Sequence, residues 1–128
     1  MEMKRNNEEH RIQCGIIDWY DLRYGDGMLI AIPNGGARDA RTGAMLRREG
    51  VRAGVWDLFL AKPSMWNGQT LENGMWIEVK RPSRRNHALG GLTNLQEEFR
   101  QRAIASGYRC KIVYTSQEGI DSISWYLS

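Results

Sequence analysis

Residues 75–80 constrain the fold more than any other segment of this 128-residue chain. Apolar side chains alternate there with Glu78 and Lys80, and side chains two residues apart lie on the same face of a β-strand. Ile77 and Val79 would then face a hydrophobic core, while an acid and a base stand together on the opposite face. The segment therefore predicts a strand with one buried face and one charged face.

Residues 55–61 form a second apolar segment, which predicts a strand that pairs with the first. The polar residues 63–74 between them carry two Asn-Gly dipeptides and predict a hairpin loop. In such a hairpin, Asp57 can lie across from Glu78. Two carboxylates facing each other on adjacent strands are the first indication of a functional site.

Asp57, Glu78 and Lys80 have the chemistry that phosphodiester hydrolysis needs. Two carboxylates and the backbone carbonyl of Val79 can ligate Mg²⁺ together with waters and a substrate phosphate. A lysine beside them can bind the scissile phosphate or lower the pKa of the attacking water. A cross-strand ion pair on an exposed sheet would leave the same residues, and for a bare Glu-Val-Lys tripeptide it is the commoner explanation.

The rest of the chain predicts a mixed sheet with helices packed on it, in the order α-β-α-β-β-α-β-α. A helix begins near Asn6 and Glu9, which form a capping pair, and a later helix begins at the capping box of Thr93 and Gln96. The other expected elements are a strand at 28–32, an Arg-rich helix at 38–49, a strand at 108–115 and a helix at 117–127.

Composition limits the classes of protein to which the chain can belong. Hydrophobic residues make up 41% of the sequence, enough for one core, so we expect a single domain over residues 1–128 with residues 1–6 frayed. No apolar run approaches the ~20 residues that cross a membrane, and the polar start is no signal peptide. Cys14 and Cys110 have no metal-binding spacing, so we expect a reducing cytoplasm and no zinc.

Five short motifs follow one another along the chain. In this order they resemble the VRR-NUC family of the PD-(D/E)XK nuclease superfamily, and in particular its compact, stand-alone members common in phages. The motifs are residues 9–13, 31–36, 49–57, 76–80 and 92–96. One departure is Trp56, where the family usually has proline before the acid. The resemblance implies an α/β, restriction-endonuclease-like fold and cleavage of DNA with Mg²⁺ or Mn²⁺.

The resemblance also implies roles for individual residues. The metal would be bound by Asp57, Glu78 and the carbonyl of Val79, and Lys80 would position or activate the water. Glu9 would reach the same site from the first helix as a further ligand of the metal or water, and Gln96 would orient Lys80 or contact a phosphate. From the residues alone, Glu9 and Gln96 are more simply explained as the capping partners of Asn6 and Thr93.

Arginines gather in two stretches, although the net charge is only +3. Charge runs are usually solvated faces, but beside a carboxylate site they become candidate phosphate contacts. The candidates for DNA binding are Arg38, Arg41, Arg81, Arg84 and Arg85.

The resemblance favours a resolvase-like homodimer that cuts branched DNA such as a four-way junction, located in the bacterial cytoplasm if phage-encoded. A two-fold dimer would place two cutting sites at a fixed spacing. An apolar surplus that one small core cannot absorb would support it: Trp19, Trp66, Trp125, Tyr126 and Leu127. The alternatives are a flap or nicking nuclease of a phage replication or packaging machine, and a non-catalytic nucleic-acid-binding module.

Overall fold

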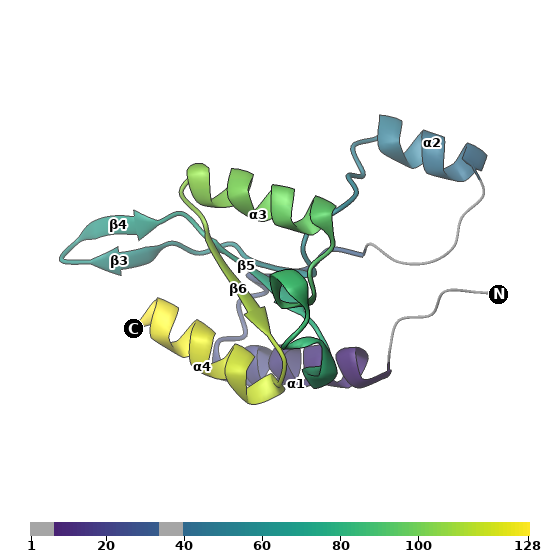
Figure 1. Ribbon diagram of the computed structural model, residues 1–128. Coiled ribbons are helices and arrows are strands. Elements are labelled where there is room, and N and C mark those ends of the chain that lie inside the picture. Colours follow the sequence, from purple (N-terminus) through teal and green to yellow (C-terminus); the bar gives the residue numbers. More distant parts are fainter. Residues whose placement is uncertain (1–6, 34–39) are drawn as a thin grey trace.

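The computed structural model of the protein describes residues 7–33 and 40–128, and every structural statement below concerns those residues. Figure 1 shows a sheet with helices on both of its faces and a separate hairpin. The helices are α1 (Asn7–Arg23), α2 (Ala40–Arg48), α3 (Asn94–Ala105) and α4 (Ser116–Leu127), with short 3₁₀ turns η1 (Pro82–Arg84) and η2 (Ala88–Gly91). The strands are β1 (Leu29–Ala31), β2 (Leu58–Leu60), β3 (Ser64–Trp66), β4 (Gln69–Glu72), β5 (Met75–Val79) and β6 (Arg109–Val113).

The central sheet is mixed, as the sequence predicted. Its strand order is β1-β2-β5-β6, in which β5 pairs antiparallel with β2 and parallel with β6. The register places Leu58 opposite Ile77 and Leu60 opposite Met75. This is the register expected when the buried side chains of both strands face one core, because a shift of one residue would turn them to the other face.

The two faces of the sheet are covered by different helices (Figure 1). Helices α1 and α4 pack on the face to which Ile77 and Val79 contribute, where Ile16, Tyr20 and other apolar side chains make the core. On the opposite face, the Trp76 ring meets the Phe99 ring of α3 edge to face at a centroid distance of 4.9 Å. Glu78, two residues after Trp76, lies on this α3 side.

Two sequence expectations for the β2 region were wrong. The strand begins at Leu58 and not at residue 55, so Asp57 precedes β2. The segment 63–74 is itself a hairpin, β3–β4, that turns at Asn67 and Gly68 with φ angles of 54° and 78°. Apart from Ser64 and Glu72, this hairpin is exposed, so it lacks the strong apolar alternation that marks a half-buried strand.

The capping predictions can be followed for three helix ends. Thr93 and Gln96 form the predicted capping box of α3, and α3 ends before Gly107, which has a φ of +91°. Helix α4 begins at Ser116, slightly earlier than expected, because the Thr115 side chain accepts a hydrogen bond from the Glu118 amide. The predicted Asn6 cap, the fraying of residues 1–6 and the candidate Arg38 lie outside the described residues.

The apolar surplus invoked for a dimer is partly absorbed by the core. Tyr126 is buried, and Trp19 and Leu127 pack against the core. Trp66 and Trp125 remain 69% and 63% exposed. None of the helices described here is long and apolar enough to cross a membrane.

Candidate active site

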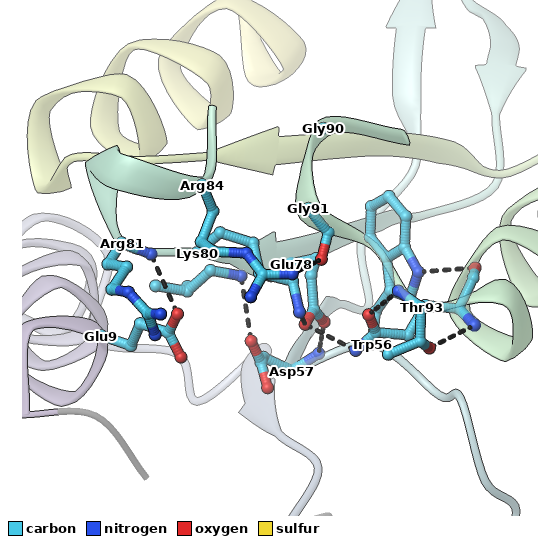
Figure 2. Close-up of polar contacts among 12 residues, drawn as sticks. Glu9, Trp56, Asp57, Glu78, Lys80, Arg81, Arg84, Gly90, Gly91 and Thr93 are labelled. Carbon is cyan, nitrogen blue, oxygen red and sulfur yellow. Dashed lines mark hydrogen bonds and ion pairs between the residues drawn. The ribbon is translucent and has the colours of Figure 1, made fainter. Parts of the chain in front are cut away.

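Asp57 and Glu78 are joined by two reciprocal hydrogen bonds (Figure 2). The Asp57 amide donates to Glu78 Oε1 at 3.0 Å, and the Val79 amide donates to Asp57 Oδ2 at 2.9 Å. Each carboxylate is therefore held by the backbone of the neighbouring segment. The sequence predicted that the two acids face each other, and the structure brings them together although Asp57 lies outside the strand.

The segment that carries Asp57 is fixed against the start of α3. Gly54 has a φ of +85°, and a Cβ atom there would lie only 2.6 Å from the Leu95 carbonyl oxygen, so only glycine fits. Trp56 is fully buried, and its indole Nε1 donates to the Gln96 carbonyl at 3.0 Å. Trp56, which departs from the family pattern, thus ties the Asp57 segment to α3. A sequence pattern shows only that this residue is apolar.

Lys80 and Gln96 both contact the same oxygen of Glu78. Lys80 Nζ lies 3.3 Å from Glu78 Oε2, and Gln96 Nε2 donates to that oxygen at 2.8 Å. The Gln96 side chain also accepts a hydrogen bond from the Thr93 amide through Oε1. The capping explanation for Gln96 is therefore confirmed, and the other atom of its side-chain amide contacts Glu78 and not Lys80, which the resemblance had implied.

Glu78 is only 3% exposed. Burial raises the pKa of this carboxyl well above its ordinary range, and the neighbouring charge of Asp57 raises it further. The Lys80 ammonium and the hydrogen bond from the Asp57 amide act in the opposite direction. Without a further cation, the site thus favours a proton on Glu78. A divalent ion would supply the positive charge that keeps both acids ionised.

Glu9 approaches the far end of β5 from α1. Its Oε2 accepts a hydrogen bond from the Arg81 amide at 2.9 Å, directly after Lys80 in the chain (Figure 2). The structure thus brings Glu9 beside the predicted site from the first helix. Its partner Arg81 is a backbone donor that the sequence did not suggest.

The arginines of residues 81–85 make more contacts within the protein than arginines on a solvated face usually do. The Arg81 side chain donates to Ser83, Arg84 donates to the Gly91 carbonyl at 3.2 Å, and Arg85 pairs with Glu118. The Arg85 guanidinium also lies 4.4 Å from the centroid of the Tyr114 ring. These contacts anchor the loop 81–91, so its basic residues do not reach freely into solvent.

Arg41, the remaining candidate arginine that the structure describes, lies on α2 and is exposed. Arg47 on α2 and Arg52 after it line a cleft that also contains Asp57. The sequence identified the Arg-rich stretch but not these two members as neighbours of the acids. Arg47 lies one turn after Gly43 and next to Leu46, and both of these residues also line the cleft. That helical spacing is the sequence feature that could have identified Arg47 as a residue of the cleft.

The donor set fits a magnesium-type ion that the substrate completes. Within the described ranges, no three His, Cys, Asp or Glu side chains gather closely enough to hold a metal by themselves. Mg²⁺ is commonly bound by one or two carboxylates, with waters and substrate phosphates filling its octahedral shell. Asp57 and Glu78 supply such a pair, and the Val79 carbonyl belongs to the residue whose amide already binds Asp57.

The comparisons with known proteins bear on the fold. A solved structure described as a VRR_NUC domain protein superposes with a TM-score of 0.73, covering 98% of this chain and 91% of that chain at 19% sequence identity. No family model matches the sequence, and the search of curated proteins gave no match. At this level of identity, the similarity establishes the architecture. The chain therefore has the fold of a VRR_NUC domain protein, a mixed sheet flanked by helices, as its five motifs predicted.

Proposed function

We propose that the protein is a metal-dependent DNA endonuclease. The observation that carries the proposal is the pair of the half-buried Asp57 and the buried Glu78, each held by the other segment's backbone amide, with Lys80 beside them. Two carboxylates brought together in this way repel each other unless a proton or a further cation joins them. The similarity to a VRR_NUC domain protein also supports a nuclease, since that name denotes a nuclease domain.

The residues of the chain would divide the work of phosphodiester hydrolysis. Asp57, Glu78 and the Val79 carbonyl would hold Mg²⁺ or Mn²⁺, which stabilises the charge that develops on the phosphate when bound. Lys80 would hold the attacking water or a phosphate oxygen in place. Gln96 would keep Glu78 in its orientation through the bond to Oε2.

Glu9 would complete the acidic edge of the site from α1. Its carboxylate is fixed by the Arg81 amide, so it would accept a hydrogen bond from a water near Lys80 without a large movement of the helix. The arginines of the 81–85 turn beside this edge, and Arg41 on the separate helix α2, would contact phosphates on either side of the cut.

A cleavage assay tests the proposal. Purified protein would be incubated with single-stranded, duplex, flap and four-way-junction DNA, with Mg²⁺, with Mn²⁺, with Ca²⁺ and with excess chelator. We expect cleavage with Mg²⁺ or Mn²⁺, binding with little cleavage in Ca²⁺, and none in chelator. Cleavage that persists in chelator would remove the metal mechanism, and DNA binding without cleavage in any metal would leave a non-catalytic binding module.

For the substrate we propose branched DNA cut by a homodimer. Trp66 on the β3–β4 hairpin and Trp125 on α4 remain exposed and both line one surface pocket, which a second copy could cover. Light scattering after size exclusion, with and without junction DNA, would measure the mass. A monomer in both conditions would favour the alternative of a flap or nicking nuclease, whose single cut needs one site.

A further inference from the structure

A cleft of about 570 Å³ opens beside Asp57, between α2 and the first turn of α3. Helix α2 lies apart from the sheet and nearest the N-terminal end of α3 (Figure 1). The lining of the cleft includes aliphatic and basic side chains, beside polar and small residues. The aliphatic ones are Leu46, Val51, Val55 and Leu95, and the basic ones are Arg47 and Arg52.

The walls of this cleft suit a flat apolar group. Leu46 and Val51 come from α2 and the segment after it, while Val55 and Leu95 come from the Asp57 segment and α3. Val51 and Leu95 are 37% and 51% exposed, which leaves aliphatic surface facing the space. Nucleobases that leave a duplex are held between apolar or aromatic side chains in this way.

The basic side chains of the cleft indicate that its ligand also carries an anionic group. Arg47 and Arg52 supply positive charge, and the Arg52 guanidinium is fixed by a bond to the Arg47 carbonyl at 2.9 Å. Guanidinium groups are suited to phosphate oxygens. A cleft with aliphatic side chains and arginines in its wall therefore matches a nucleotide, which joins a flat base to an anionic phosphate.

The cleft is continuous with the proposed active site, because Asp57 and Gln96 form part of its lining. A strand whose scissile phosphate lies at the acids would thus pass its neighbouring nucleotide into the cleft. The volume is that of a small-molecule site, whereas specific recognition of a double helix needs a broad protein surface of about 1,000–2,500 Å².

We propose that this cleft receives one unpaired nucleotide of the cleaved strand, adjacent to the scissile phosphate. The inference rests on the proposed nuclease function and names its substrate class: DNA that is unpaired at the cut. Because the walls that would meet the base are aliphatic, the cleft distinguishes unpaired from paired nucleotides and not one base from another.

Substitutions on α3 give a matched test. Leu95 lines the cleft, whereas Ile104 lies near the other end of the same helix outside it, and their exposed fractions are 51% and 55%. Leu95→Trp fills the cleft, and Ile104→Trp adds the same bulk elsewhere. Val51→Trp closes the cleft from the opposite wall and serves if Leu95→Trp disturbs the first turn of α3. Thermal unfolding of all three variants checks the fold.

The readout is binding in metal-free buffer as well as cleavage. Two duplexes of one sequence would be compared, one fully paired and one with a single unpaired 2-aminopurine nucleotide. We expect the intact protein to prefer the second, to change the probe's fluorescence, and to lose about tenfold in affinity for it on Leu95→Trp or Val51→Trp, the scale of one lost base contact. Ile104→Trp should leave the preference unchanged.

The outcomes separate the two proposals. Equal affinity for both duplexes, or an unchanged preference in Leu95→Trp and Val51→Trp, overturns the cleft proposal, even if metal-dependent cleavage of paired DNA upholds the nuclease. A preference that the two cleft variants abolish, in a protein that cleaves no DNA with any metal, supports the cleft only as a site for an unpaired nucleotide and overturns the nuclease.

Discussion

The two faces of β5 are held by different kinds of interaction. Ile77 points into the apolar core between the sheet and the α1–α4 pair, where contacts are non-directional and shared among many side chains. Glu78, its neighbour, points to the α3 side, where its two oxygens contact Asp57, Lys80 and Gln96. The first face stabilises the fold by apolar burial, whereas the second orients one carboxylate through a few directed bonds. Substitutions on the first face should therefore lower stability, and substitutions on the second should lower cleavage.

The largest effect is expected on the polar face. Glu78→Ala should lower the cleavage rate on the order of a hundredfold to a thousandfold, because a ligand of the proposed metal and the charge stabilisation that it supports are lost. Single-turnover cleavage at saturating DNA would measure it. Near-normal cleavage by folded Glu78→Ala protein would remove this residue from the site, and Asp57→Ala and Lys80→Ala should behave alike.

On the apolar face the effect should be on stability. Ile77→Ala leaves a cavity in a fully buried position and should lower the free energy of unfolding by about 2–5 kcal/mol. Urea unfolding would measure this, and cleavage per folded molecule should stay near that of the parent protein. A large loss of activity without loss of stability would show that the two faces are not separable.

The capping box offers a finer comparison. Thr93→Ala removes one cap bond of α3 and should cost about 1 kcal/mol, and Gln96→Ala should cost a similar amount. Only Gln96→Ala also removes the hydrogen bond to Glu78. Gln96→Ala should therefore reduce cleavage more than Thr93→Ala at equal stability. Equal losses of activity in the two variants would reduce Gln96 to a helix cap.

The pH dependence of stability should also differ between the faces. The raised pKa of Glu78 means that the folded, metal-free protein keeps this proton at pH values where the unfolded chain has lost it. Its contribution to stability is complete below the ordinary carboxyl pKa and is lost as the pH rises through the raised pKa. Urea unfolding in chelator from about pH 4 to about pH 9 should show this loss, and Glu78→Gln should lessen it. An identical pH profile for Glu78→Gln would contradict the assignment.

The smallest effect concerns the basic residues. Arg41→Ala should reduce the slope of log affinity against log salt by about one unit if Arg41 contacts one phosphate. Arg85→Ala should change the slope less, because Glu118 and Tyr114 already engage its guanidinium. Anisotropy titrations at several salt concentrations would compare them. A larger change for Arg85 would mean that the ion pair with Glu118 opens on binding.

Local sequence patterns predicted much of the fold. Alternation in β5 fixed which residues face the core, and the Thr93–Gln96 spacing located the start of α3, because both depend on neighbours in sequence. The approach of Asp57 to Glu78 also followed from the pairing of two apolar strands. The contacts of Trp56 with α3 and of Glu9 with the Arg81 amide join residues 40 and 72 positions apart, and no local pattern encodes them.

The hairpin β3–β4 and the cleft beside α2 are two further features that local sequence patterns did not predict. The hairpin is exposed over most of its length, so burial imposes little period on its sequence. The cleft is a space between segments that are separated along the chain. The resemblance to the VRR-NUC family supplied the global arrangement, which the fold comparison confirms. It did not supply the contact of Trp56 with α3 or the cleft beside α2.

Gln96 both caps α3 and donates a hydrogen bond to Glu78, so local unfolding of the first turn of α3 would affect the acidic pair. Helix ends open locally far more often than a protein unfolds, and amide hydrogen exchange records those openings. Each opening of the first turn of α3 would release the amide that holds Glu78 Oε2. Any ligand that needs Glu78 in its present orientation must therefore suppress the opening. Slower deuterium uptake at the amides of Gln96 and Glu97 would then report on occupancy of the acidic pair, without any cleavage being measured.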